Sequence, residues 1–160
     1  MPRPYIFFLF LVACQQQVPA VRQDLTGKEI PPVILERPDS SYTDLRSVAK
    51  DSKLLLVYMS PFCPYCRAQI TDMLQQQDRL PDEKICLLTI ASRQDASYFY
   101  KAFKLQDHPD IIFGIDTGKT FPKFIQSHGV PYTAAYQRNR LVSLFAGKLD
   151  MAQLSRINHD

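Results

Sequence analysis

Residues 54–66 read Leu-Leu-Leu-Val-Tyr-Met-Ser-Pro-Phe-Cys-Pro-Tyr-Cys, an apolar run that ends close to two cysteines. The continuous apolar run predicts a buried strand over residues 53–59. The apolar spacing beyond Cys66 predicts a helix that begins at the cysteines. A helix N-terminus carries partial positive charge and favours a thiolate over a thiol. We therefore expect thiol–disulfide exchange, in which Cys63 is the nucleophile and Cys66, one turn along, resolves the mixed disulfide.

A pair of cysteines separated by two residues has two other interpretations. Half of a zinc site needs two further ligands. The chain has no second pair of this kind, and His108, His128 and His159 show no spacing that would complete a site. A purely structural disulfide would close so short a loop that it would constrain the unfolded chain little. We expect no metal and no organic cofactor.

Length and composition are those of a single globular domain. The chain has 160 residues, of which 46% are hydrophobic, and this suits one domain with a buried core. The formal net charge is only +3. No basic block or interleaved aromatic stripe is present, so nucleic acid is not an expected partner.

The N-terminus has the pattern of a secretory signal. Arg3 precedes the apolar residues 5–13, and Cys14 follows them. The apolar stretch is too short for a spanning helix, which takes about 20 residues. Leu11-Val12-Ala13-Cys14 resembles the lipobox of bacterial lipoproteins, which implies a signal peptide over residues 1–13, cleavage before Cys14, and a lipid on its sulfur. An ordinary signal peptide that leaves Cys14 unmodified is the alternative.

The rest of the chain predicts an α/β fold. Residues 14–40 are polar and punctuated by proline, so we interpret them as a tether with an edge strand at residues 32–35. The folded domain is expected over residues 41–160, as a central mixed sheet flanked by helices. After a short helix or turn near residue 45, further strands are expected over residues 84–91, 111–115, 132–137 and 141–145, and further helices over 94–105, 119–128 and 151–157. Cys86 falls in a buried strand and is expected to be inert.

Two motifs together resemble the thioredoxin superfamily. The first is the strand, the segment Cys63-Pro64-Tyr65-Cys66 and the helix. The second is Gly129-Val130-Pro131-Tyr132, between a helix and a hairpin with a tight turn. The resemblance implies that Pro131 is cis and lies beside the active-site disulfide. It also implies that the backbone at Val130 binds substrate as an added strand.

Within this superfamily, the passage between Cys66 and Pro131 is longer than in minimal thioredoxin. It holds an extra strand–helix insertion, and its length is similar to that of the membrane-anchored TlpA/ResA branch. The superfamily's buried carboxylate is replaced by Val57, so no base for Cys66 is identified. The dipeptide Pro-Tyr between the cysteines also occurs in glutaredoxins.

These observations predict an extracytoplasmic, lipid-anchored thiol–disulfide oxidoreductase, with the membrane contacted through the anchor. Its partners would be protein thiols or disulfides and an upstream redox partner. Phe62 and Tyr65 would flank the exposed sulfur and contact substrate. A glutathione-linked reductase and a redox-inert module that binds extended peptides remain alternatives. Peroxidase chemistry is not expected, because Leu56 stands where peroxiredoxins have a proline.

Overall fold

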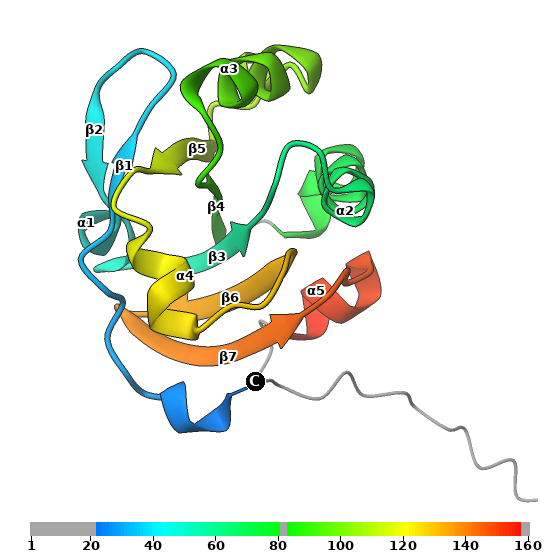
Figure 1. The fold of residues 1–160 in the computed structure, drawn as a ribbon. Coiled ribbons are helices and arrows are strands. Elements are labelled where there is room, and N and C mark those ends of the chain that lie inside the picture. Colours follow the sequence, from blue (N-terminus) through cyan, green and yellow to red (C-terminus); the bar gives the residue numbers. More distant parts are fainter. Residues whose placement is uncertain (1–21, 81–82, 158–160) are drawn as a thin grey trace, which may run out of the picture.

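A single mixed sheet with helices on both faces forms the fold in the computed structural model, which describes residues 22–80 and 83–157 (Figure 1). The strands are β1 (Ile34–Glu36), β2 (Tyr42–Asp44), β3 (Lys53–Tyr58), β4 (Glu83–Thr89), β5 (Ile111–Asp116), β6 (Tyr132–Gln137) and β7 (Arg140–Ala146). The α-helices are α1 (Leu45–Ala49), α2 (Pro64–Gln75), α3 (Arg93–Ala102), α4 (Thr120–Ile125) and α5 (Met151–Ile157). The seven strands lie in the order β2-β1-β5-β4-β3-β6-β7. The predicted α/β fold is confirmed.

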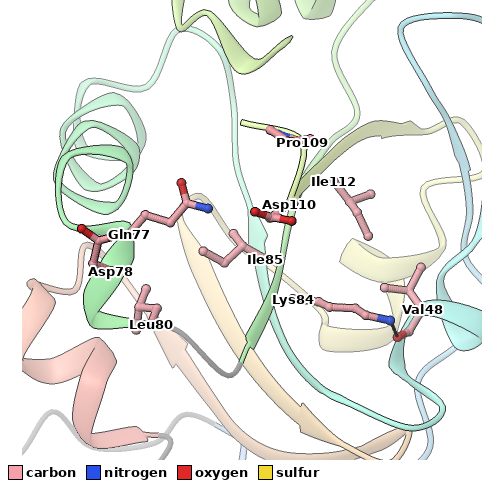
Figure 2. A pocket seen from close by; sticks show the side chains of 9 residues that line it. All are labelled: Val48, Gln77, Asp78, Leu80, Lys84, Ile85, Pro109, Asp110 and Ile112. Atoms are coloured by element: carbon pink, nitrogen blue, oxygen red, sulfur yellow. Dashed lines mark hydrogen bonds between the residues drawn. The ribbon is translucent and has the colours of Figure 1, made fainter. Parts of the chain in front are cut away.

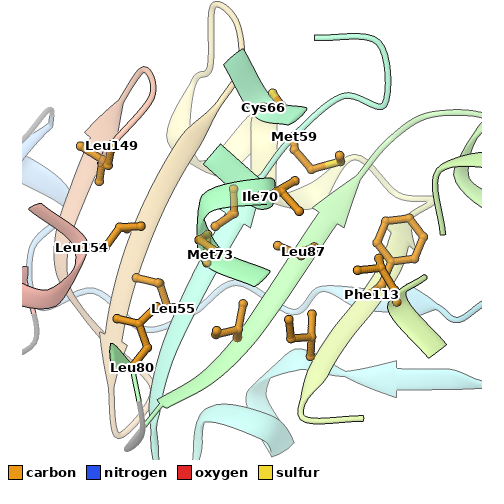
Figure 3. Close-up of a cluster of buried hydrophobic side chains, with 14 of the residues drawn as sticks. Leu55, Met59, Cys66, Ile70, Met73, Leu80, Leu87, Phe113, Leu149 and Leu154 are labelled. Carbon is orange, nitrogen blue, oxygen red and sulfur yellow. The ribbon is translucent and has the colours of Figure 1, made fainter. Parts of the chain in front are cut away.

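Strand β3 lies inside the sheet and carries the cysteines at its carboxyl end. It pairs in parallel with β4 and antiparallel with β6. Because successive strand residues point to opposite faces, its apolar run supplies two separate cores. Leu55 and Val57 belong to the core under α2, α3 and α5, where Figure 3 shows Leu55 among its neighbours. Leu54 and Leu56 belong to the core under α1 and α4. Burial on both faces explains why the run is continuous rather than alternating.

The hairpin of β6 and β7 is joined by the predicted two-residue turn. Arg138 and Asn139 both have positive φ, at 48° and 65°. Two left-handed residues in succession are typical of the turn whose twist matches the flanking strands. The hairpin begins at Tyr132, directly after Pro131.

The expected strand–helix insertion before Pro131 is present. Helix α3 and strand β5 lie between β4 and α4 in the chain, and β5 pairs in parallel with β4. On its other side β5 pairs antiparallel with β1. The insertion therefore widens the sheet and places α3 next to the carboxyl end of β4.

The N-terminal part of the fold differs from the prediction. Leu25, Ile30 and Val33 are buried in the core, so the described residues before 41 are not a tether. The strand expected at the sheet edge over residues 32–35 is observed as β1, which lies between β2 and β5. The edge is formed by β2, in a segment for which a short helix or turn was expected. These strands are only three residues long, so their stability comes from their partners rather than from a local pattern.

The predicted signal peptide and Cys14 lie outside the described residues. Within residues 22–80 and 83–157, no helix has the length and apolar character needed to cross a membrane.

Candidate redox site

Cys63 and Cys66 meet at the start of α2, as the sequence predicts. Cys63 is the N-cap residue, and its Sγ accepts a hydrogen bond of 3.4 Å from the backbone N–H of Cys66. Pro64 occupies the first helical turn, where backbone N–H groups have no partner within the helix, so the missing N–H of proline costs no hydrogen bond. Cys63 is partly exposed, whereas Cys66 is fully buried. The two thiols therefore differ in access: substrate can reach the first sulfur but not the second.

The segment with Val130 and Pro131 lies directly beside the exposed sulfur. The Cys63 thiol donates to the Val130 carbonyl at 3.7 Å, and the Val130–Pro131 peptide bond is cis. The Pro131 carbonyl accepts from the backbone N–H of Gly147 at 2.8 Å, which ties the segment to the end of β7. Both predicted residues are thus brought to the cysteine pair by a segment 67 positions further along the chain.

Phe62 and Tyr65 are the most exposed aromatic side chains close to the cysteines in sequence. Their exposed fractions are 68% and 66%. Both side chains are therefore accessible to a molecule that approaches Cys63. Their role in contacting a substrate stays a prediction.

Burial dominates the chemistry of the second cysteine. It raises the pKa of Cys66 from 9.0 to about 12, while a hydrogen bond from the Ser60 backbone N–H partly opposes the shift. Hydrogen bonding and charge interaction with Cys63 raise the pKa further. Among the described residues, no carboxylate is a cause of this shift. Val57, which by the resemblance stands at the position of a carboxylate, is buried in the same core as Cys66.

The third described cysteine is separate from this site. Cys86 is fully buried, and burial raises the pKa of its thiol. It lies in the core on the opposite face of the sheet from Cys66. A buried, protonated thiol on the other face cannot take part in exchange at Cys63.

A buried glutamine behind the cysteines was missed at the sequence level. Gln69, fully buried on α2, donates through Nε2 to the Thr133 hydroxyl at 2.9 Å. Its Oε1 accepts from the backbone N–H of Leu149 at 3.0 Å. Thr133 is the cross-strand partner of Val57. A neutral amide–hydroxyl pair therefore lies next to Val57, the residue that by the resemblance stands in place of a carboxylate. Its only sequence signal is that position 69 is three residues after Cys66, on the same helix face.

Arg67 was also missed, and it joins α2 to the insertion. Its guanidinium carbon lies 4.8 Å from the ring centroid of Phe103 and 5.9 Å from that of Phe99. Its Nη1 donates to the Pro61 carbonyl at 3.2 Å. One side chain thus connects the helix of the cysteines, the loop before them and the aromatic residues at α3.

A groove of about 510 Å³ opens beside the cysteine loop. Three segments form it: the end of β3 with its following loop, the β4–α3 loop, and the segment that leads to Pro131. Its lining consists of Tyr58, Met59, Ser60, Phe62, Thr89, Ile90, Ala91, Asp95, Ser127, Gly129 and Val130. Phe62 and Val130 belong both to the groove and to the surroundings of Cys63.

A second hollow, of about 820 Å³, lies at the other end of the sheet (Figure 2). It is lined by residues that include Lys84 and Ile85 near the start of β4, and the Lys84 ammonium donates to the Val48 carbonyl at 3.3 Å. Because β3 and β4 are parallel, this hollow and the cysteines lie at opposite ends of the strands. It therefore has no part in the redox site.

Metal-ligating side chains do not gather anywhere in the described part of the chain. No three His, Cys, Asp or Glu residues of residues 22–80 and 83–157 are close enough together to hold an ion.

Comparisons with known proteins find similarity in structure but not in sequence. No protein-family model matches the chain, and no curated protein matches it by sequence. The solved structures that resemble it include a secreted disulfide oxidoreductase from Mycobacterium tuberculosis, with a TM-score of 0.66 and 13% identity over 79% of this chain and 93% of that chain. The exposed lipoprotein thioredoxin of Streptococcus pneumoniae has a TM-score of 0.65 and 17% identity over 79% and 98%.

A third similar structure carries a different name. Reduced Prx3 from Vibrio vulnificus has a TM-score of 0.69 and 12% identity over 84% of this chain and 98% of that chain. Identities this low establish the fold but not the activity. The chain has the fold of the thioredoxin superfamily, with a strand and a helix inserted before the cis-proline.

Proposed function

We propose that this protein is a thiol–disulfide oxidoreductase that exchanges disulfides with protein thiols through Cys63 and Cys66. The observation that carries the proposal is the unequal access of two thiols held one helical turn apart. The partly exposed Cys63 accepts a hydrogen bond from the N–H of Cys66, whose own sulfur is fully buried. This arrangement suits one attacking and one resolving thiol.

In the reducing direction, the Cys63 thiolate attacks one sulfur of a substrate disulfide. A Cys63–substrate disulfide forms, and the first substrate sulfur leaves as a thiolate. The Cys66 thiolate then attacks the Cys63 sulfur, forms the Cys63–Cys66 disulfide and releases the second substrate thiolate. Two electrons pass to the substrate, and the protons lost by the two cysteines end, through solvent, on the substrate thiols. An upstream dithiol donor must then reduce the pair, and the oxidising direction is the reverse sequence.

The fold alone does not select this activity, because Prx3 has a similar structure. The second cysteine selects it, since a resolving thiol one turn after the first makes an internal disulfide available. The secreted disulfide oxidoreductase from Mycobacterium tuberculosis has a similar fold, which supports the choice. The exposed Phe62 and Tyr65 favour a polypeptide over a small thiol as partner.

We also propose that the protein acts outside the cytoplasm while anchored to a membrane by lipid on Cys14. The support is the pattern Leu11-Val12-Ala13-Cys14 after an apolar run. The similar fold of the exposed lipoprotein thioredoxin from Streptococcus pneumoniae adds to it. Several acyl chains together, each contributing about 0.8 kcal/mol per buried methylene, would hold such an anchor in the bilayer.

Trapping of mixed disulfides tests the proposed activity. Cys66→Ser removes the resolving sulfur, so adducts on Cys63 should accumulate and be identified by mass spectrometry. Polypeptide adducts support the proposal, glutathione adducts would indicate a glutathione-linked reductase, and no adduct would indicate a redox-inert binding module. Cys63→Ala should abolish reduction of a protein disulfide such as that of insulin. Cys86→Ala is the matched control and should leave the rate nearly intact, so equal loss from both changes would refute the assignment.

A further inference from the structure

We propose that Arg67 is a positioning residue for disulfide exchange: its side chain fixes the loop of residues 60–62, whose backbone contacts both cysteines, and two aromatic rings at α3 fix Arg67 in turn. The inference rests on the proposed function and adds a residue to the same site. The reaction step that depends on Arg67 is the second one, in which the Cys66 thiolate attacks the Cys63 sulfur.

The backbone of Ser60 contacts both members of the cysteine pair. Its N–H donates a hydrogen bond to the Cys66 sulfur, and its carbonyl accepts one of 3.2 Å from the Cys63 N–H. A hydrogen bond to the charged form of an acid stabilises that form. The N–H of Ser60 therefore favours the attacking thiolate of Cys66, and a displacement of Ser60 would weaken that thiolate's stabilisation.

Arg67 holds this loop at its middle residue, Pro61. Because Pro61 is buried, its carbonyl needs a hydrogen-bond partner within the protein, and the Nη1 of Arg67 donates to it at 3.2 Å. The hydrogen bond within the loop, from the Phe62 N–H to the Ser60 hydroxyl, is 3.4 Å long, which exceeds the usual length. Without Arg67 the loop should therefore shift, so that the Pro61 carbonyl can reach water.

Two aromatic rings at α3 hold the guanidinium of Arg67. Its carbon lies 4.8 Å from the ring centroid of Phe103 and 5.9 Å from that of Phe99, and the centroids of the two rings are 4.2 Å apart. A cation this close to aromatic rings is attracted to them. No carboxylate in the described part of the chain forms an ion pair with Arg67. Its side chain is therefore placed by the two rings and the Pro61 carbonyl.

These two kinds of contact require an arginine. A planar guanidinium can stack on an aromatic ring while its edge donates hydrogen bonds in fixed directions, whereas a lysine ammonium is a compact charge on a flexible chain. The backbone of Arg67 is fixed in α2, where its N–H donates to the Cys63 carbonyl at 3.0 Å. Arg67→Lys therefore keeps the backbone and the charge but loses the geometry of the side chain.

The first reaction step should depend on Arg67 much less. The Cys63 sulfur accepts from the Cys66 N–H at 3.4 Å and lies 3.7 Å from the Val130 carbonyl, and neither contact involves residues 60–62. In this step the Cys63 thiolate bonds to one substrate sulfur, and the other leaves with the electron pair. In the second step Cys66 gives its proton to solvent, bonds to the Cys63 sulfur and releases the remaining substrate thiolate. Slowing of the second step alone therefore identifies the role of Arg67.

The test mixes the reduced protein with an equal amount of the symmetrical disulfide of nitrothiobenzoate in a stopped-flow spectrometer. Attack by Cys63 releases one coloured nitrothiobenzoate at a rate that rises with concentration, and attack by Cys66 releases the second at a rate that does not. Cys63→Ala gives the background from other thiols. Arg67→Met should slow the second release about tenfold or more, as small displacements of reacting groups do, and leave the first nearly unchanged. Arg67→Lys should slow the second release nearly as much.

Matched controls separate this contact from general effects of charge and aromatic packing. Arg79→Met removes the same charge from an exposed arginine in the short helix Gln77–Arg79, and it should change neither release. Phe103→Leu should also slow the second release, and combining it with Arg67→Met should slow it no further, because the ring acts through Arg67. Tyr98→Leu, which alters a 66% exposed aromatic residue on the same helix, should have no effect.

Four results would overturn the inference. They are a wild-type second release in Arg67→Met, a wild-type second release in Arg67→Lys, equal slowing of both releases, and additive effects in the double variant. Urea-induced unfolding confirms that each variant is folded, and Arg67→Lys keeps the test available if Arg67→Met does not fold. Failure of the proposed function gives a different result, because the wild-type protein would then release one nitrothiobenzoate per molecule, or none, instead of two.

Discussion

Replacement of Gln69 by methionine should strongly destabilise the protein, although methionine has a similar size and helix propensity. The side chain is fully buried, and it makes two hydrogen bonds that join α2 to β6 and to the segment before α5. The substitution leaves the Thr133 hydroxyl and the Leu149 N–H without these partners. A buried polar group that loses its partner costs about 1–3 kcal/mol. The free energy of unfolding should therefore fall by about 2–6 kcal/mol for the two groups together.

A double variant distinguishes lost hydrogen bonds from altered packing. In Gln69→Met with Thr133→Val, the orphaned hydroxyl is removed, so part of the loss should be recovered relative to the sum of the single changes. The coupling between the two positions should be about 1–3 kcal/mol. The measurement is urea-induced unfolding, followed by circular dichroism. Gln75→Met, an exposed position on the same helix, is the control and should change stability by less than about 0.5 kcal/mol. A loss below about 1 kcal/mol for Gln69→Met, or strict additivity, would refute the reasoning.

Three other predictions concern the cysteines. The first is that a preformed Cys63 mixed disulfide should be resolved about tenfold faster per pH unit between about pH 7 and 10. Burial raises the pKa of Cys66 to about 12, and only the Cys66 thiolate attacks. Resolution rates from stopped-flow measurements that do not change with pH would contradict this prediction. The reduced protein should lose stability as the pH rises above 9.0, since the unfolded Cys66 thiol ionises there while the folded thiol does not. Urea midpoints that are unchanged above that pH would count against it. Cys14→Ala should move the protein from the membrane fraction to the soluble fraction, or stall its processing, and a variant that fractionates and matures like wild type would exclude the anchor.

The sequence was sufficient where a local pattern matched the local structure. The continuous apolar run predicted β3, because a strand that is buried on both faces is apolar throughout. The spacing beyond Cys66 predicted α2, because an amphipathic helix repeats every 3.6 residues. The turn at Arg138 was also predicted from the sequence, since two residues between strands can adopt few turn types. The cysteine pair and the segment at Pro131 could be assigned to one site only through the resemblance to a known superfamily.

The elements that were missed depend on distant partners. Strand β2 and the place of β1 inside the sheet were missed. Each strand has three residues, which is too short for a periodic signal, and β1 is fixed by pairing with β5. A glutamine such as Gln69 would be expected on the exposed face of a helix. It is buried because Thr133, which is 64 positions away, supplies a hydrogen-bond partner. A polar side chain can be buried where its hydrogen bonds are satisfied. No local sequence pattern shows that Thr133 would be the partner of Gln69.

The groove is the strongest example, because its residues come from three separate segments and meet only in the folded sheet. The inserted helix has two effects there. It contributes Asp95 to the groove, and its aromatic rings Phe99 and Phe103 pack on Arg67, which also donates to the carbonyl of Pro61. The loop that carries Phe62 and Cys63 is therefore fixed by the same helix that borders the groove. A change in the insertion should therefore alter the shape of the groove and the position of the reactive sulfur together, because both depend on the contacts of Arg67 with α3.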